Sequence, residues 1–452
     1  VKTLDTTRPY CFPQTPTVFW NMFKAMPDSV DMLDFHYPKQ DELRKLAKEL
    51  DRPMVASEYC HALGLDFGNQ EESYEIMYEN PKLAGGAVWE FFDQGILRKV
   101  KKPNTKNEAT IYAWAAKDSL YDTGETMGTD GIMYADRTPQ TDYWHIRKTF
   151  TPVKAMEDTL AYKAGNQSFN IKLMNRFDFT NLSAITCKWQ LFADNKQMGS
   201  GVLPTINCKP HDTTTITINA VLPEKPTASY YYLKLLLEDK SKKQFYEKTY
   251  LIQQKGSKSL LSNIAQQKKA QPVKTGDAIA TDNYSFEWLK GNGTVQLKTK
   301  DGNPIIAGGP FARVGRKPSM AQDATTSSKR SKVLHTIWNP FLLSNPITQV
   351  KQFDAKQLVV NYQYKPDSIK ERTLVGDIAY SFTDSGYINI NYSLEPASKE
   401  EAVEAGLSFL IPSTFTEFRW VGKGPYAAYP GKERQSEFGI HHLNSSDLYF
   451  SG

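Results

Sequence analysis

The chain has 452 residues, of which 40% are hydrophobic, 23% charged and 12% aromatic. At about 150 residues per domain, this length predicts about three domains, and the composition excludes collagen-like, coiled-coil and low-complexity chains. A net charge of +5, from 55 basic and 50 acidic residues, gives no ground for a nucleic-acid or membrane partner. No run of 18 or more apolar residues occurs, so we expect no membrane-spanning segment.

The first 150 residues alternate short apolar strands with amphipathic helices. The sequence predicts strands over residues 8–12, 30–37, 53–59 and 84–92. Helices are predicted over 40–50 and 69–79, where apolar residues recur at helical spacing between charged ones. Repeated strand, helix, strand units are typical of a parallel sheet, as found in βα-barrels and in doubly wound sheets.

From about residue 150 onward the pattern is that of strands alone. Alternating apolar and polar residues over 169–174, 213–218 and 230–238 predict a β-sandwich. Residues 253–275 are rich in Lys, Gln and Ser and show little periodicity, which indicates a linker. Strands predicted over 286–289, 294–297, 357–364 and 387–391, with a turn at 300–303, indicate a second and larger β domain.

The four cysteines, at positions 11, 60, 187 and 208, are too few for a disulfide framework in a chain of this length. Their spacing matches no metal-binding motif. Cys187 and Cys208 are the one pair for which a disulfide stays open.

Polar and aromatic side chains follow three of the predicted strands at their carboxyl ends, where βα-barrel enzymes carry their chemistry. The strand over 53–59 ends with Glu58 and is followed by His61, the strand over 30–37 ends with His36 and Tyr37, and Trp89 lies near the end of the strand over 84–92. A tyrosine can hydrogen-bond a carboxylate, and a tryptophan face can stack on a sugar ring. This set suits carbohydrate, whereas any one of these residues alone fits a structural role better.

The segments SEYCHALG at 57–64, GGAVWEFFDQG at 85–95 and DGIMYADRTPQTDYW at 130–144 resemble motifs of the large bacterial β-galactosidases of glycoside hydrolase family 2. The stretch WVGKGP at 420–425, followed by Tyr429 and Pro430, is similar to a late motif of the same family. The resemblance implies a multidomain α/β plus all-β protein. Its parts are the C-terminal half of a TIM (βα)8 barrel over 1–150, an immunoglobulin-like β-sandwich over 151–255, a linker over 256–275 and a galactose-mutarotase-like β-supersandwich over 276–452.

The resemblance also implies roles for individual residues. Glu58 matches the nucleophile that forms a covalent glycosyl-enzyme intermediate, and Tyr37 matches the tyrosine that contacts it. His61 and Trp89 match sugar-binding residues. The implied activity is retaining hydrolysis of terminal non-reducing β-D-galactose residues.

Four positions depart from the family pattern. His36 replaces a methionine and is expected to contact the substrate, and Asp130 stands where the family has an asparagine that contacts the sugar and a sodium ion. Leu65 replaces an asparagine, and Glu90 replaces an aspartate. Asp130 is therefore both a substrate-binding candidate and a possible sodium contact.

A retaining glycosidase needs a second carboxylate as acid and base. The family's acid/base glutamate lies in an Asn-Glu motif on the fourth barrel strand, and no such motif precedes Tyr37. We therefore expect a fragment that begins after that strand, is inactive alone, and joins a missing N-terminal part or forms a homo-oligomer. The resemblance implies Mg and Na as cofactors, with most Mg ligands upstream of Val1. Glu90 or Asp93 as proton donor in a complete chain is the weaker alternative.

Two alternatives for function stay open. Basic residues in 311–332, among them Arg313 and Lys317, could bind sulfate or carboxylate groups of a charged galactan, although a solvated loop explains them better. The first alternative is therefore another family 2 exo-β-glycosidase, of the β-glucuronidase or sulfated-galactan type, and the second is a non-catalytic carbohydrate-binding protein. We expect a periplasmic or extracellular location rather than a cytoplasmic one.

Overall fold

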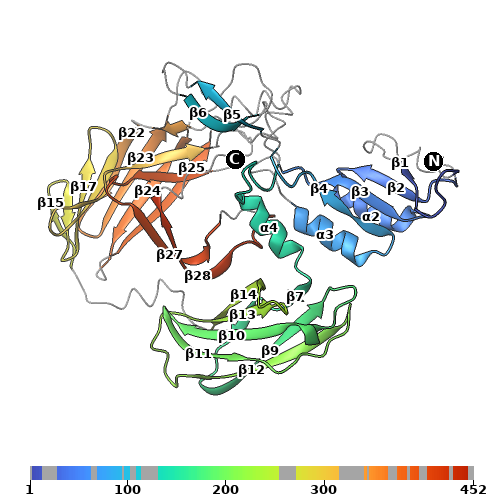
Figure 1. The fold of residues 1–452 in the computed structure, drawn as a ribbon. Coiled ribbons are helices and arrows are strands. Elements are labelled where there is room, and N and C mark those ends of the chain that lie inside the picture. The colour runs from blue at the N-terminus through green and yellow to red at the C-terminus, as the bar shows by residue number, and fades with distance from the viewer. Residues whose placement is uncertain are drawn as a thin grey trace.

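A computed structural model describes the chain in three regions, a parallel sheet with helices and two β-rich regions (Figure 1). The described residues are 3–12, 28–62, 69–93, 96–101, 108–113, 131–253, 271–314, 341–343, 346–364, 374–383, 387–396, 405–426 and 431–445. Within these ranges, no helix has the length and apolar character needed to cross a membrane.

The first region contains a four-stranded parallel sheet with strand order β1-β2-β3-β4. Its strands are β1 (Cys11–Phe12), β2 (Met32–His36), β3 (Met54–Tyr59) and β4 (Leu83–Val88), and its helices are α2 (Gln40–Glu49) and α3 (Gln70–Glu79). Each strand pairs with the next one along the chain, an order that is also found in a segment of a βα-barrel. All four strands were predicted too long, most of all the first and the last, because β1 begins at Cys11 and β4 ends at Val88.

Helix α2 forms where the apolar spacing predicted a helix. Leu43 and Leu46 are fully buried against the sheet, and the Lys39 backbone N–H donates to the Glu42 carboxylate at 2.8 Å, which caps the first turn. Helix α3 contacts α2 and buries Ile76 and Met77. These helices cover one face of the sheet and leave the carboxyl ends of the strands to carry the site.

Three elements of this region were not predicted. Strands β5 (Ile96–Lys101) and β6 (Glu108–Ala113) form an antiparallel hairpin, and α4 (Thr141–Thr149) follows. The buried residues of α4 are mostly polar, namely Asp142, His145, Ile146 and Thr149. An apolar stripe is the signal that predicts a helix, and α4 lacks one because polar groups make its contacts.

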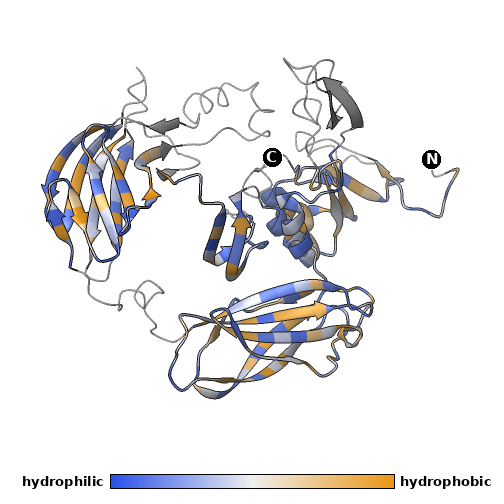
Figure 2. Cartoon of the chain, turned by 60° about the vertical axis from the view of Figure 1, so that its left-hand side comes forward, coloured by the Kyte–Doolittle hydropathy of each residue, from blue (hydrophilic) through white to orange (hydrophobic). Residues whose placement is uncertain are grey.

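The second region is a two-sheet sandwich, as the alternating pattern predicted (Figure 2). One sheet has the order β11-β10-β13-β14-β8 and the other β12-β9-β7. The elements are β7 (Val153–Ala155), β8 (Thr159–Ala161), β9 (Gly165–Asn175), η4 (Leu182–Ala184), β10 (Thr186–Ala193), β11 (Lys196–Val202), β12 (Thr213–Leu222), β13 (Tyr231–Glu238) and β14 (Gln244–Gln253). Cys187 and Cys208 are both buried in the shared core as free thiols, so no disulfide joins them.

The third region is antiparallel. Its strands are β15 (Val273–Thr275), β16 (Ala278–Ala280), β17 (Tyr284–Leu289), β18 (Thr294–Thr299), β19 (Pro304–Ile306), β20 (Gly308–Val314), β21 (Phe341–Leu343), β22 (Ile347–Phe353), β23 (Gln357–Tyr364), β24 (Leu374–Phe382), β25 (Ile388–Pro396), β26 (Ala405–Leu410), β27 (Glu417–Gly424) and β28 (Glu437–Asn444). A core that includes Trp288 and Tyr380 lies between the sheets β15–β19 and β22–β25. The predicted linker is too long by three residues, because 273–275 form β15.

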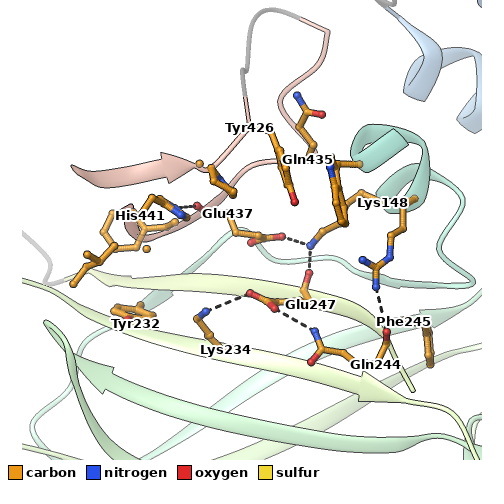
Figure 3. Close-up of a pocket in the computed structure, with 17 residues that line it drawn as sticks. Lys148, Tyr232, Lys234, Gln244, Phe245, Glu247, Tyr426, Gln435, Glu437 and His441 are labelled. Atoms are coloured by element: carbon orange, nitrogen blue, oxygen red, sulfur yellow. Dashed lines mark hydrogen bonds and ion pairs between the residues drawn. The ribbon is translucent and has the colours of Figure 1, made fainter. Parts of the chain in front are cut away.

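The three regions meet at a junction between α4, the β13 and β14 strands of the sandwich and the β27–β28 hairpin (Figure 3). Lys148 Nζ lies 2.6 Å from Glu437 Oε1, and the Thr249 backbone N–H donates to Glu437 Oε2 at 2.7 Å. Lys234 pairs with Glu247 across the floor of the same pocket, whose volume is about 310 Å³. The Lys148–Glu437 ion pair links α4 to β28, whereas the Lys234–Glu247 pair lies within the sandwich.

Candidate active site

Backbone hydrogen bonds join the segments that follow β2, β3 and β4. The Tyr37 N–H donates to the Glu58 carbonyl at 2.7 Å, and the Ala62 N–H donates to the Trp89 carbonyl at 2.7 Å. The Trp89 N–H donates to the Tyr59 carbonyl at 3.3 Å. Three segments that are distant in sequence are thereby held side by side at the carboxyl edge of the sheet.

Glu58 and Tyr37 form the closest side-chain contact at this edge. Tyr37 Oη donates to Glu58 Oε2 at 2.6 Å, a short distance that is typical of a hydroxyl bound to a carboxylate. The Tyr37 ring stacks on His61 with ring centroids 5.4 Å apart and planes at 15°. The side chain of Glu58 is 25% exposed, so a ligand can reach the carboxylate from solvent.

His36 lies between two carboxylates. Its Nδ1 is 4.0 Å from Glu58 Oε2, and its Nε2 is 3.7 Å from Asp34 Oδ2. Both distances exceed hydrogen-bond length.

The backbone turns sharply after β2 and β3. Tyr37 has a φ of 52° and Cys60 a φ of 51°, in the left-handed region that few residues other than glycine adopt. Such conformations persist where the surrounding structure holds them, and they cluster at functional sites. Burial raises the pKa of the Cys60 thiol to about 12, so this cysteine is not a nucleophile.

Asp93 has a structural role. Its Oδ1 accepts from the Gly131 N–H at 2.9 Å and from Gln140 Nε2 at 3.1 Å, and its Oδ2 accepts from the same amide at 3.1 Å. The carboxylate is 5% exposed and links the segment after β4 to the start of α4. Both carboxylate oxygens of Asp93 therefore accept hydrogen bonds that hold the local fold.

The structure brings together Glu58, Tyr37, His36 and His61, and it ties Trp89 to them through the backbone. Two predicted features, Asp130 and Leu65, lie outside the described residues, as does most of the basic stretch 311–332. Sequence reasoning missed Asp34, a carboxylate that is 3% exposed in β2. An acidic residue inside an apolar strand was the available signal, since buried charges need partners.

The described residues form no cluster of metal-ligating side chains. Across the ranges that the structure describes, no three or more His, Cys, Asp and Glu side chains gather closely enough to hold an ion.

Three family models match successive parts of the chain. "Glycosyl hydrolases family 2, TIM barrel domain" matches residues 1–155, "Beta-galactosidase, domain 4" matches 171–255 and "Beta galactosidase small chain" matches 280–451. The β-galactosidase of Staphylococcus xylosus is 22% identical over 95% of this chain and 43% of its own length. That of Pseudoalteromonas haloplanktis is 23% identical over 88% of this chain and 40% of its own length.

The chain thus spans about two fifths of the length of these curated relatives. Among solved structures, a β-glucuronidase of Bacteroides uniformis is 14% identical and covers 91% of this chain and 48% of its own. Its TM-score of 0.27 is too low to support an inference about fold or function. The three family models and the β-galactosidase relatives agree with one another: the chain resembles the β-galactosidases and belongs to glycosyl hydrolase family 2.

Proposed function

We propose that this chain carries the nucleophile of a retaining β-galactosidase. A carboxylate oxygen of Glu58 forms a bond to the anomeric carbon while the bond from that carbon to the glycosidic oxygen breaks. The departing oxygen takes a proton from a second carboxylic acid. Water then attacks the anomeric carbon, gives its proton to the same carboxylate and releases both galactose and Glu58.

One observation supports this proposal most strongly, the 2.6 Å hydrogen bond from Tyr37 Oη to Glu58 Oε2 at the joined strand ends. The bond fixes the orientation of one oxygen of the carboxylate that acts as nucleophile. His36 Nδ1 lies 4.0 Å from the same Glu58 oxygen, and the His61 ring stacks on the Tyr37 ring. Glu58 is thus oriented and still accessible.

The proposal requires an acid/base carboxylate about 5–5.5 Å from Glu58. Asp93 is engaged by Gly131 and Gln140, so we assign the acid/base role to a residue outside the described site. We further propose that the parallel sheet belongs to a (βα)8 barrel, the sandwich is immunoglobulin-like and the third region is a supersandwich. By family resemblance, a β-galactoside substrate, Mg and Na as cofactors and a homo-oligomeric assembly belong to the same proposal.

Covalent trapping tests the nucleophile. The complete gene product is incubated with 2,4-dinitrophenyl 2-deoxy-2-fluoro-β-galactoside. Its dinitrophenolate leaving group needs no proton from an acid catalyst, and its fluorine slows hydrolysis of the covalent intermediate. We expect one adduct per site on the peptide that contains Glu58, found by mass spectrometry. Glu58→Gln should give no adduct while it keeps the wild-type fold, and the control Glu90→Gln should still be labelled.

The outcomes separate the alternatives. Absence of an adduct in the folded wild-type protein refutes the proposal. Labelling by the corresponding 2-fluoroglucuronide alone would indicate a β-glucuronidase. Saccharide binding without labelling by any reagent would indicate a carbohydrate-binding protein.

A further inference from the structure

Strand β3 contains a β-bulge next to Glu58. In the pairing with β2, a step of two residues in β2 (Asp34 to His36) opposes a step of three in β3 (Val55 to Glu58). In the pairing with β4, a step of three residues in β3 (Ala56 to Tyr59) opposes a step of two in β4 (Gly86 to Val88), after a shift in the opposite sense between Met54 and Ala56. Near the carboxyl end of β3, both neighbours therefore register one extra residue in β3, and the two intervals overlap on Ala56–Glu58.

The bulge determines which way Glu58 points. A regular strand would place Glu58 on the same face as Met54 and Ala56, which are both fully buried. In the structure Tyr59 takes that buried position, while Ser57 and Glu58 are both partly exposed. The extra residue thus moves the carboxylate out of the core, a known use of bulges beside active sites.

A bulge leaves a backbone N–H without its ladder partner, and here a side chain supplies one. Asp34 Oδ1 accepts from the Ser57 N–H at 3.0 Å, and Asp34 Oδ2 accepts from Ser57 Oγ at 2.7 Å. Asp34 is 3% exposed, so these bonds form in a setting where an unpaired amide or carboxylate is costly. Both Asp34 carboxylate oxygens thus accept hydrogen bonds from Ser57, the residue directly before Glu58.

We infer that Asp34 is a positioning residue for the reaction, because it fastens the β3 bulge that presents Glu58 to the substrate. Asp34 does not contact the substrate in this inference; it acts through Ser57. The inference rests on the proposed role of Glu58 as nucleophile. Its structural part, that the Asp34–Ser57 contact sets the direction of Glu58, can be tested separately.

The kinetic test compares rates of covalent trapping in the complete gene product. Asp34→Ala should lower the maximal rate of adduct formation by about 10- to 100-fold, the effect of misplacing a reacting group by about 1 Å, with little change in the reagent concentration at half-maximal rate. Asp34→Asn should restore much of the rate, because its amide can still accept from the Ser57 N–H and donate to Ser57 Oγ. Ser57→Ala, which removes only the hydroxyl bond, should lie between wild type and Asp34→Ala.

Leu46→Ala is the matched control, since it opens a cavity under the same sheet and leaves the Asp34–Ser57 contact intact. It should lower the melting temperature without lowering the trapping rate per folded molecule. Equal trapping rates for Asp34→Ala and Leu46→Ala would overturn the inference. If Asp34→Ala does not fold, Ser57→Ala decides the question, and a wild-type rate for it also overturns the inference.

A crystal structure of Asp34→Ala, or of Ser57→Ala, separates this inference from the proposed function. We expect the Tyr37 to Glu58 hydrogen bond to be broken and Glu58 to turn from its wild-type position. An unchanged contact refutes the inference even if wild type is trapped. If wild type forms no adduct but Glu58 is displaced in the variant, Glu58 is not the nucleophile. The Asp34–Ser57 contact would then still set the direction of Glu58.

Discussion

His145 in α4 should make the protein sensitive to acid. Its side chain is fully buried, and burial lowers the pKa of the imidazole from 6.5 to about 4. Glu71 and Glu433 act in the opposite direction, and Arg434 adds to the lowering. The native protein therefore keeps a neutral histidine at pH values where the unfolded chain takes up a proton.

The sign and size of the effect follow from linkage. Because the pKa is lower in the native state, the stabilisation is fully present above pH 6.5 and is lost as the pH falls toward 4. With these two pKa values, the free energy of unfolding should fall by about 2 kcal/mol between pH 7.5 and pH 5 through His145 alone.

Urea unfolding at both pH values measures this loss, with His145→Gln as the test variant. The glutamine does not titrate, so its free energy of unfolding should fall by about 2 kcal/mol less than that of wild type over the same pH interval. His211→Gln is the matched control, because it removes a histidine whose side chain is 55% exposed and leaves the buried His145 in place. An equal pH dependence for His145→Gln and wild type would refute the reasoning.

Three further changes probe other contacts. Tyr37→Phe removes the hydrogen bond to Glu58 and should lower kcat for an aryl β-galactoside by about 10- to 100-fold, the value of a bond to a charged group; an unchanged kcat would exclude Tyr37 from the site. Gly131→Ala would place a Cβ 2.2 Å from the Asp93 backbone nitrogen and should lower stability by about 1–3 kcal/mol in urea unfolding, whereas an unaltered midpoint would contradict the packing argument. Glu437→Gln leaves Lys148 without a carboxylate and should lower the free energy of unfolding by about 1–3 kcal/mol, and a smaller loss at 1 M NaCl than at low salt would support the ionic origin.

The predictable part of the fold is the part that buries apolar residues at regular spacing. Helix α2 was predicted because Leu43 and Leu46 recur on one face, and the sandwich strands because apolar and threonine residues alternate. Helix α4 was missed because its buried face carries Asp142 and His145, whose partners lie in other regions of the chain. The spacing of apolar residues in one sequence predicts helices and strands that pack against apolar neighbours. It does not predict a helix whose buried contacts are polar.

The candidate site shows the same division. Glu58, Tyr37 and His61 could be proposed from their places at strand ends, since parallel strands bring those ends to one edge. Asp34 could not be paired with Ser57, because regular alternation places no extra residue in β3 and leaves the Ser57 N–H in its ladder bond. At the bulge the tertiary structure departs from the local sequence pattern, and the bulge includes the proposed nucleophile, Glu58. This is the expected place for such a disagreement, because a carboxylate that follows the strand pattern would be buried in the core and could not reach a substrate.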